Sequence, residues 1–162
     1  MSEREQQSLG GLSSAITIAR GVPTIRTRPK GDVPVHSVAS LFDGGEPNAY
    51  VDMDDIADVR ALVAEPGDVI LGIEGARLGE SFSVVEGLPT FVPSQQAVTI
   101  RVADPSLLHP GYVAAWAASP QTRQQVQRLA RGTTIQRIAV ADIATLVIPS
   151  RLSKCRQTSA SA

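Results

Sequence analysis

Cationic side chains gather in two segments of this sequence. Arg26, Arg28 and Lys30 lie within one short loop, and a longer stretch between Asp104 and Asp142 contains no carboxylate. That acid-free stretch holds four arginines, Arg123, Arg128, Arg131 and Arg137. Long cationic side chains can neutralise phosphates, and arginine can also donate two hydrogen bonds to one guanine. The two segments therefore indicate binding of a polyanion, with an ordinary solvated surface as the alternative.

Polar groups that could read bases stand beside these cations. Arg77 lies in the Gly75–Gly79 turn, where glycines let a ligand approach the backbone closely. Gln95 and Gln96 carry side-chain amides, and one such amide can form two hydrogen bonds with a single adenine. Further on, hydroxyl and amide groups adjoin Arg137, and they belong to Thr133, Thr134 and Gln136. We expect Ile135 and Ile138, which alternate with this polar set, to face the core.

The sequence shows few residues in patterns typical of enzyme active sites. His36 and His109 are far apart in the sequence, whereas a zinc site needs three or four clustered ligands. Asp52, Asp54, Asp55 and Asp58 could hold Mg²⁺ through two carboxylates, but acids so placed more often mark a helix N-terminus. The sequence contains neither a G-x-S-x-G elbow nor a phosphate-binding glycine loop. We therefore predict no catalytic residue, no metal and no cofactor.

Length and composition favour one globular domain. The chain has 162 residues, of which 43% are hydrophobic and 19% charged. Its net charge of −1 conceals an asymmetry, because residues 51–100 hold two basic and nine acidic groups while residues 101–162 hold eight and two. No apolar run approaches the roughly 20 residues that cross a bilayer. The polar N-terminus is unlike a secretory signal, and the single Cys155 allows no internal disulfide, so a cytoplasmic location without membrane contact is expected.

Apolar patterning predicts strands before helices. We expect a flexible leader over residues 1–14, a folded domain over 15–150 and a disordered tail over 151–162. Strands are predicted from β-branched residues and turn signals at 16–25 (with a turn), 33–41, 69–73, 82–85 and 97–102.

Two helices are predicted in the C-terminal third. Pro110 suits a first helical turn, and Tyr112 and Trp116 are spaced to share a buried face. Ser119 is predicted to cap a second helix over residues 120–131, with Gly132 as the residue just past its end. The inward stripe of this second helix consists of Thr122, Val126, Leu129 and Ala130. Its arginines then fall on the outward side without acidic partners.

Short motifs also run in a fixed order along residues 16–149. The C-terminal ones are HPGYVAAW at 109–116, SP at 119–120, GTTIQRI at 132–138 and LVIP at 146–149. The earlier ones are IARGVP at 18–23, VPVHSV at 33–38, PGDVIL at 66–71, the Gly75–Gly79 turn and QQAVTIR at 95–101. In order and spacing they resemble a target-recognition domain of the DNA-specificity subunit of type I restriction–modification systems.

The resemblance implies an α+β fold with a twisted mixed β-sheet and C-terminal helices. It implies a non-catalytic protein whose partners are double-stranded DNA, an adenine methyltransferase (modification) subunit and, through it, a restriction subunit. Family members usually carry two such domains, each followed by a long helix, whereas no heptad pattern follows residue 149 here. A homodimer could supply the second copy. Base-reading residues differ with the target in this family, so the site residues named above rest on their chemistry alone.

Two other functions remain open at this point. The chain could be a protein–protein docking module that uses its acidic middle as the interface, or an inactive truncated remnant. A small metal-dependent enzyme built on the aspartate cluster is a more distant alternative.

Overall fold

The computed structural model describes residues 6–149, and the expectations for residues 1–5 and for the tail from residue 151 lie outside the described residues. The strands are β1 (Gln6–Ser8), β2 (Ile16–Arg20), β3 (Val33–His36), β4 (Ala49–Val51), β5 (Val69–Gly72), β6 (Ser81–Ser83), β7 (Val92–Pro93), β8 (Ala97–Val102) and β9 (Val147–Pro149). The α-helices are α1 (Val38–Asp43), α2 (Met53–Asp58), α3 (Pro110–Ala117), α4 (Pro120–Leu129) and α5 (Val140–Ile143). Short 3₁₀ turns are η1 (Gly10–Leu12), η2 (Thr24–Arg26) and η3 (Gly75–Arg77).

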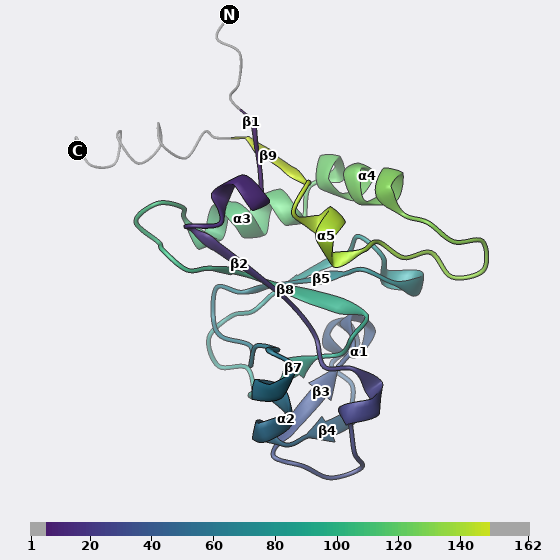
Figure 1. The fold of residues 1–162 in the computed structure, drawn as a ribbon. Helices are drawn as coiled ribbons and strands as arrows, with labels where there is room; N and C mark the ends of the chain where they lie inside the picture. Colours follow the sequence, from purple (N-terminus) through teal and green to yellow (C-terminus); the bar gives the residue numbers. More distant parts are fainter. Residues whose placement is uncertain (1–5, 150–162) are drawn as a thin grey trace, which may run out of the picture.

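The strands form three small sheets. The largest is antiparallel in the order β2-β8-β5-β6, the second has the order β4-β3-β7 with β3 and β7 parallel, and β1 pairs with β9. Helices α3, α4 and α5 lie on one side of the four-stranded sheet, while the second sheet lies with α1 and α2 on the other (Figure 1). The predicted α+β class with C-terminal helices is confirmed, and its mixed pairing is confined to the second sheet.

The central strands of the four-stranded sheet, β5 and most of β8, are buried on both faces. Alternate residues of a strand point to opposite faces. Val69 and Leu71 join the large core cluster with Trp116 of α3, whereas Ile70 between them packs in the cluster that contains Val38 of α1. All of β5 is buried, which explains why it reads as a continuous apolar run. Burial on both faces fixes the register of β5 against β8, because a slip of one residue would exchange the two faces.

The N-terminal segment is part of the fold from residue 6. The backbone N–H of Leu9 donates to the carbonyl of Leu146 at 2.9 Å, and that of Gly10 donates to Ala144 at 2.8 Å. The side chain of Leu9 is only 1% exposed. The flexible leader expected over residues 1–14 is therefore wrong for residues 6–14, because a polar segment with one buried leucine adds a strand beside β9.

Two other element boundaries differ from the prediction. The strand expected over residues 33–41 stops at His36, because the Ser37 hydroxyl accepts a hydrogen bond from the Ser40 N–H at 3.1 Å and caps α1. Helix α4 ends at Leu129 instead of Arg131, since Ala130 is already extended with φ −66° and ψ 142°. None of the helices within residues 6–149 is long and apolar enough to cross a membrane.

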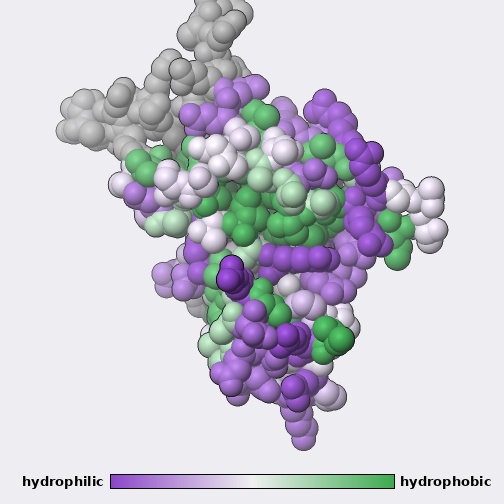
Figure 2. All heavy atoms as spheres, viewed as in Figure 1, coloured by the Kyte–Doolittle hydropathy of each residue, from purple (hydrophilic) through white to green (hydrophobic). Residues whose placement is uncertain are grey.

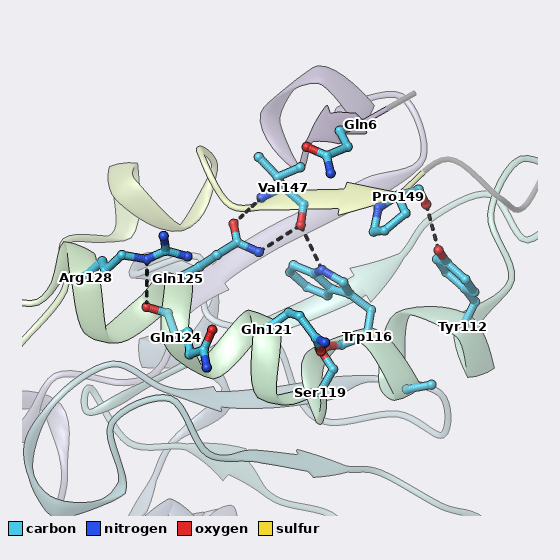
Figure 3. A pocket seen from close by; sticks show the side chains of 11 residues that line it. Gln6, Tyr112, Trp116, Ser119, Gln121, Gln124, Gln125, Arg128, Val147 and Pro149 are labelled. Carbon is cyan, nitrogen blue, oxygen red and sulfur yellow. Dashed lines mark hydrogen bonds between the residues drawn. The ribbon is translucent and has the colours of Figure 1, made fainter. Parts of the chain in front are cut away.

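The C-terminal helices are fastened to β9 by side chains. As predicted, Ser119 caps α4 and Trp116 is buried, and His109 caps α3 by accepting from the Gly111 N–H. The Trp116 indole N–H donates to the carbonyl of Val147 at 2.9 Å (Figure 3). The Gln125 amide pairs with the same residue twice, since its nitrogen donates to the Val147 carbonyl at 3.1 Å and its oxygen accepts from the Val147 N–H at 2.8 Å. The Gln125 side chain thus gives Val147 of β9 the donor and the acceptor that a neighbouring strand would otherwise provide.

We expect Gln125→Ala to lower the free energy of unfolding by about 1–3 kcal/mol, because it leaves a part-buried backbone N–H without its partner. Gln124→Ala is the matched control, since the Gln124 side chain is exposed and its substitution should change stability by less than about 0.5 kcal/mol. Urea denaturation followed by tryptophan fluorescence measures both. Equal stability of the two variants would contradict the role given to Gln125.

Candidate nucleic-acid interface

Three segments that carry candidate residues meet at one end of the four-stranded sheet. In the antiparallel register, Gly72 at the end of β5 lies opposite Ala97 at the start of β8, and Arg20 at the end of β2 lies opposite Val98. Turn η3 follows β5, residues 94–96 precede β8, and η2 follows β2. Strand pairing therefore brings η3, Gln95–Gln96 and η2 with Arg26 to the same end of the sheet, while the chain from Arg28 onward runs along β4.

The loop of residues 131–137 is attached to η3 through its backbone. Arg131 and Arg137 pair with each other, N–H to carbonyl, at 2.8 and 2.9 Å. The Gly75 N–H donates to the carbonyl of Gln136 at 3.0 Å, and the Ile138 N–H donates to Ile73 at 2.9 Å. These bonds bring the predicted polar set after α4 next to the turn that carries Arg77.

The shape of this loop depends on a glycine. Gly132 has φ +118°, and a Cβ at this position would overlap the carbonyl oxygen of Ile135. Because the chain folds back so tightly, strand-like alternation does not continue through the loop. Ile138 is buried as predicted, but Ile135 is 49% exposed, so its expected place in the core is wrong.

Glu80 connects two of the predicted cations. Its carboxylate accepts from Arg77 and from Arg123 of α4, each at 2.9 Å. Arg77 also lies 5.6 Å from the centre of the Phe42 ring and 3.8 Å from Asp43. The hydrogen bond to Glu80 raises the pKa of Arg77 above its ordinary value. The expectation that Arg123 has no acidic partner is therefore wrong, and sequence analysis missed Glu80 although it follows Arg77 by three residues.

Arg131 and Arg137 form no ion pair with a carboxylate in residues 6–149. Both are exposed, and they border a shallow hollow of about 460 Å³ together with Thr133 and Thr134. Gln136 is exposed as well, and only its backbone is engaged with η3. This loop thus offers two uncompensated cations beside hydroxyl and amide groups.

The segment before β8 links η3 to η2. Gln96 accepts through its carbonyl from the Ile73 N–H at 2.8 Å, and its side chain is exposed. The Gln95 amide oxygen accepts from the Thr24 N–H at 3.2 Å, while the Gln95 carbonyl accepts from Arg20 at 3.1 Å. One predicted base-reading amide is thus partly used to hold η2 in place, and the other points to solvent.

The arginines of the η2 loop are matched by acids of α2. Arg26 contacts Asp55 at 2.8 Å and Asp58 at 2.7 Å, and these hydrogen bonds raise its pKa. Arg28 lies 3.8 Å from both Asp52 and Asp55. Asp54 and Asp55 occupy the first turn of α2, as the helix-terminus interpretation expected. A search of residues 6–149 finds no group of three or more potential ligands placed to hold a metal ion.

Lys30 and Arg128 have other surroundings. Lys30 is exposed and forms no ion pair within the described residues. Arg128 lies about 140° around the helix from Arg123. It borders an amide-rich groove of about 660 Å³ between α4 and β9, with Gln121 and Gln124 (Figure 3). Arg128 therefore lies apart from the other arginines of the acid-free stretch.

The gathered segments form what we call the recognition edge, defined as η2, residues 94–96, η3 and residues 131–137. In Figure 1 these turns project from the same side of the molecule as the tip of the loop after α4. Figure 2 shows that hydrophilic groups dominate this side, with isolated hydrophobic groups between them. Of the predicted site residues, Arg28, Lys30 and Arg128 lie outside this edge, since Arg28 pairs with Tyr50 of β4 and Arg128 borders the groove beside β9. Arg123 adjoins the edge through Glu80.

No family model matches the chain, and no curated protein matches its sequence significantly. Solved structures do match its fold. The S subunit of a type I restriction–modification system from M. genitalium superposes with a TM-score of 0.60 at 15% identity, covering 98% of this chain and 38% of that one. A chain from a structure of complex assembly and conformational transition of the type I R-M system has a TM-score of 0.59 at 16% identity, with 96% and 36% covered. The HsdS subunit from Thermoanaerobacter tengcongensis has a TM-score of 0.56 at 14% identity, with 96% and 36% covered.

The chain has the fold of one type I target-recognition domain. It spans just over a third of the length of these S subunits and matches them over nearly all of its own length. The fold therefore agrees with the resemblance that the short sequence motifs indicated.

We expect Glu80→Gln to strengthen binding of a duplex of random sequence, because it releases Arg77 and Arg123 from a carboxylate. The plot of log affinity against log salt should become steeper by about one to two, the change expected for one or two further phosphate contacts. Glu86→Gln is the control, since it removes the same charge at a residue that forms no ion pair in the described part of the chain. Identical salt dependence for both variants would mean that these arginines do not face the polyanion.

Proposed function

We propose that the chain binds double-stranded DNA sequence-specifically and directs a separate adenine-N6 methyltransferase subunit, within a type I restriction–modification complex in the cytoplasm. In this proposal it acts as a solitary specificity-subunit-like domain. A second copy, in a homodimer, would read the second half of the target. The restriction subunit would join through the methyltransferase.

The observation that carries the proposal is the loop of residues 131–137. It is fixed by four backbone hydrogen bonds, and it holds two uncompensated arginines next to exposed Thr133, Thr134 and Gln136. A groove reader needs base-facing polar groups flanked by phosphate-facing cations, because phosphate contacts position the protein and base contacts select the sequence. A rigid loop also loses little conformational entropy on binding. The target-recognition fold supports the same function.

The ion-paired arginines have a second role in this proposal. Arg26 and Arg28 rest on α2 carboxylates, and Arg77 rests on Glu80. DNA phosphates would compete with these carboxylates for the same arginine donors. The acids would therefore lower the affinity for non-specific DNA, and only a DNA backbone that fits the recognition edge would displace them.

We expect Arg131→Ala to weaken binding to all duplexes alike and to lower the salt slope by about 0.9, as loss of one phosphate contact requires. Arg128→Ala is the matched control, because it removes the same charge from the groove beside β9. Titration of a labelled duplex at two salt concentrations measures both. An equal effect of the two variants would contradict the recognition edge as the DNA surface.

Gln136→Ala should affect sequence preference instead. If its amide makes a bidentate base contact, the variant loses about 1–3 kcal/mol on a duplex selected by the wild-type chain and little on a scrambled duplex. Competition between the two duplexes gives the difference directly. Equal losses on both would assign Gln136 to positioning of the backbone.

We further propose that the chain is not itself an enzyme. Purified alone, it should neither transfer methyl groups from S-adenosylmethionine to DNA nor cut DNA with Mg²⁺ or Mn²⁺. Methyl transfer is followed with radiolabelled cofactor and cleavage on supercoiled plasmid. Metal-dependent nicking that disappears in Asp54→Ala/Asp55→Ala would overturn this proposal and favour an enzyme built on the aspartate cluster.

A further inference from the structure

Two isoleucines project from the recognition edge into solvent. Ile25, at the centre of η2, is 90% exposed, and Ile135 is 49% exposed. Single exposed apolar residues are common and usually need no explanation. These two differ from that background in three respects, namely the rigidity of the turns that hold them, the cations beside them and their position on the same edge.

The exposed position of Ile25 is fixed by hydrogen bonds of the residues on either side of it. The Arg26 N–H donates to the Pro23 carbonyl at 2.9 Å, and the Thr27 N–H donates to the Thr24 carbonyl at 3.0 Å. The Gln95 amide anchors the start of the turn through the Thr24 N–H. With its backbone fixed in this way, Ile25 cannot turn inward, and its side chain contributes nothing to the core.

Ile135 is held out in the same manner. The mutual pairing of Arg131 and Arg137 closes the base of its loop, and Gln136 is bonded to η3. The close approach of Gly132 to the Ile135 carbonyl fixes the tip. The glycine and the backbone hydrogen bonds thus hold Ile135 at the surface. Exposure of its apolar side chain to water is unfavourable unless a partner covers it.

The chemistry around both tips limits what that partner can be. Arg26 and Arg28 follow Ile25, while Arg131 and Arg137 flank Ile135. An apolar protein surface would leave Arg131 and Arg137, which form no ion pair in the described residues, without counter-charges at the contact. DNA offers phosphates beside apolar groups in its grooves. The apolar group that distinguishes a base in the major groove is the 5-methyl of thymine.

We propose that Ile25 and Ile135 are specificity-determining residues that each contact the methyl group of a thymine in the major groove. This inference rests on the proposed function and adds the bases that the domain reads. The flanking arginines would hold the backbone while the isoleucine reads one position. Thr133, Thr134 and Gln136 would then contribute the hydrogen bonds at neighbouring bases.

The test uses the full 162-residue chain and random-sequence duplex libraries made with either thymine or deoxyuridine, which pairs identically but lacks the methyl group. We expect wild-type chain to enrich a motif with thymine at defined positions from the first library and to lose preference at those positions in the second. Ile135→Ala should lose one thymine position and Ile25→Ala another, with the rest of the motif retained.

A defined duplex then isolates the contact. Replacing the assigned thymine by deoxyuridine should weaken wild-type binding about fourfold, the value of one buried methyl group, and should leave Ile135→Ala unchanged. Leu107→Ala is the matched control, since Leu107 is 50% exposed in the loop between β8 and α3 and should behave as wild type in every assay. Thermal melting checks that all variants are folded.

The outcomes separate the two proposals. If wild-type chain enriches no motif from either library, the proposed DNA-binding function fails, and this inference fails with it. If a motif is enriched but neither isoleucine variant alters it, or if the alterations are insensitive to deoxyuridine, the function stands and the thymine contact is overturned.

Discussion

The pairing of β5 with β8 is the constraint on which the rest of the molecule depends. Both strands are buried on both faces, so their register cannot slip without exposing one set of apolar side chains. Antiparallel pairing places the end of β5 opposite the start of β8, and β2 ends beside them. Every segment of the recognition edge leaves the sheet at this end or is bonded to a segment that does. The site is thus a consequence of strand register.

Attachment of the C-terminal part follows from the same sheet. Ile73, just beyond β5, accepts from the Ile138 N–H, and this bond sets where the 131–137 loop can lie. The helices that precede it are fastened to β9 by Trp116 and Gln125, and β9 is paired in turn with β1. Because the scaffold is rigid on both sides of the loop, its tip residues are presented in one arrangement without packing against the core.

Charge at the recognition edge is graded. Arg26 and Arg77 are ion-paired with carboxylates, whereas Arg131 and Arg137 form no ion pair in the described part of the chain. Ion pairs between exposed groups contribute little to stability, so these acids cost little to displace when a stronger anion arrives. Partly buried Arg101 is different, since it donates hydrogen bonds to Asp68, which is only 2% exposed, and to the Val63 carbonyl, and it stabilises the fold.

Local chemistry in the sequence determined the central strands, the two C-terminal helices, the cap at Ser119, the inward stripe of α4 and the candidate polar residues. These features depend on neighbours within a turn or a strand, so periodicity and capping chemistry reveal them. Only the tertiary structure decided that residues 6–14 belong to the fold, that Glu80 joins Arg77 to Arg123, that Ile135 is displayed and that Arg128 lies elsewhere. Each of these depends on partners far apart in the chain, such as Leu9 with Leu146 or Gly75 with Gln136, and no local pattern encodes such a pairing.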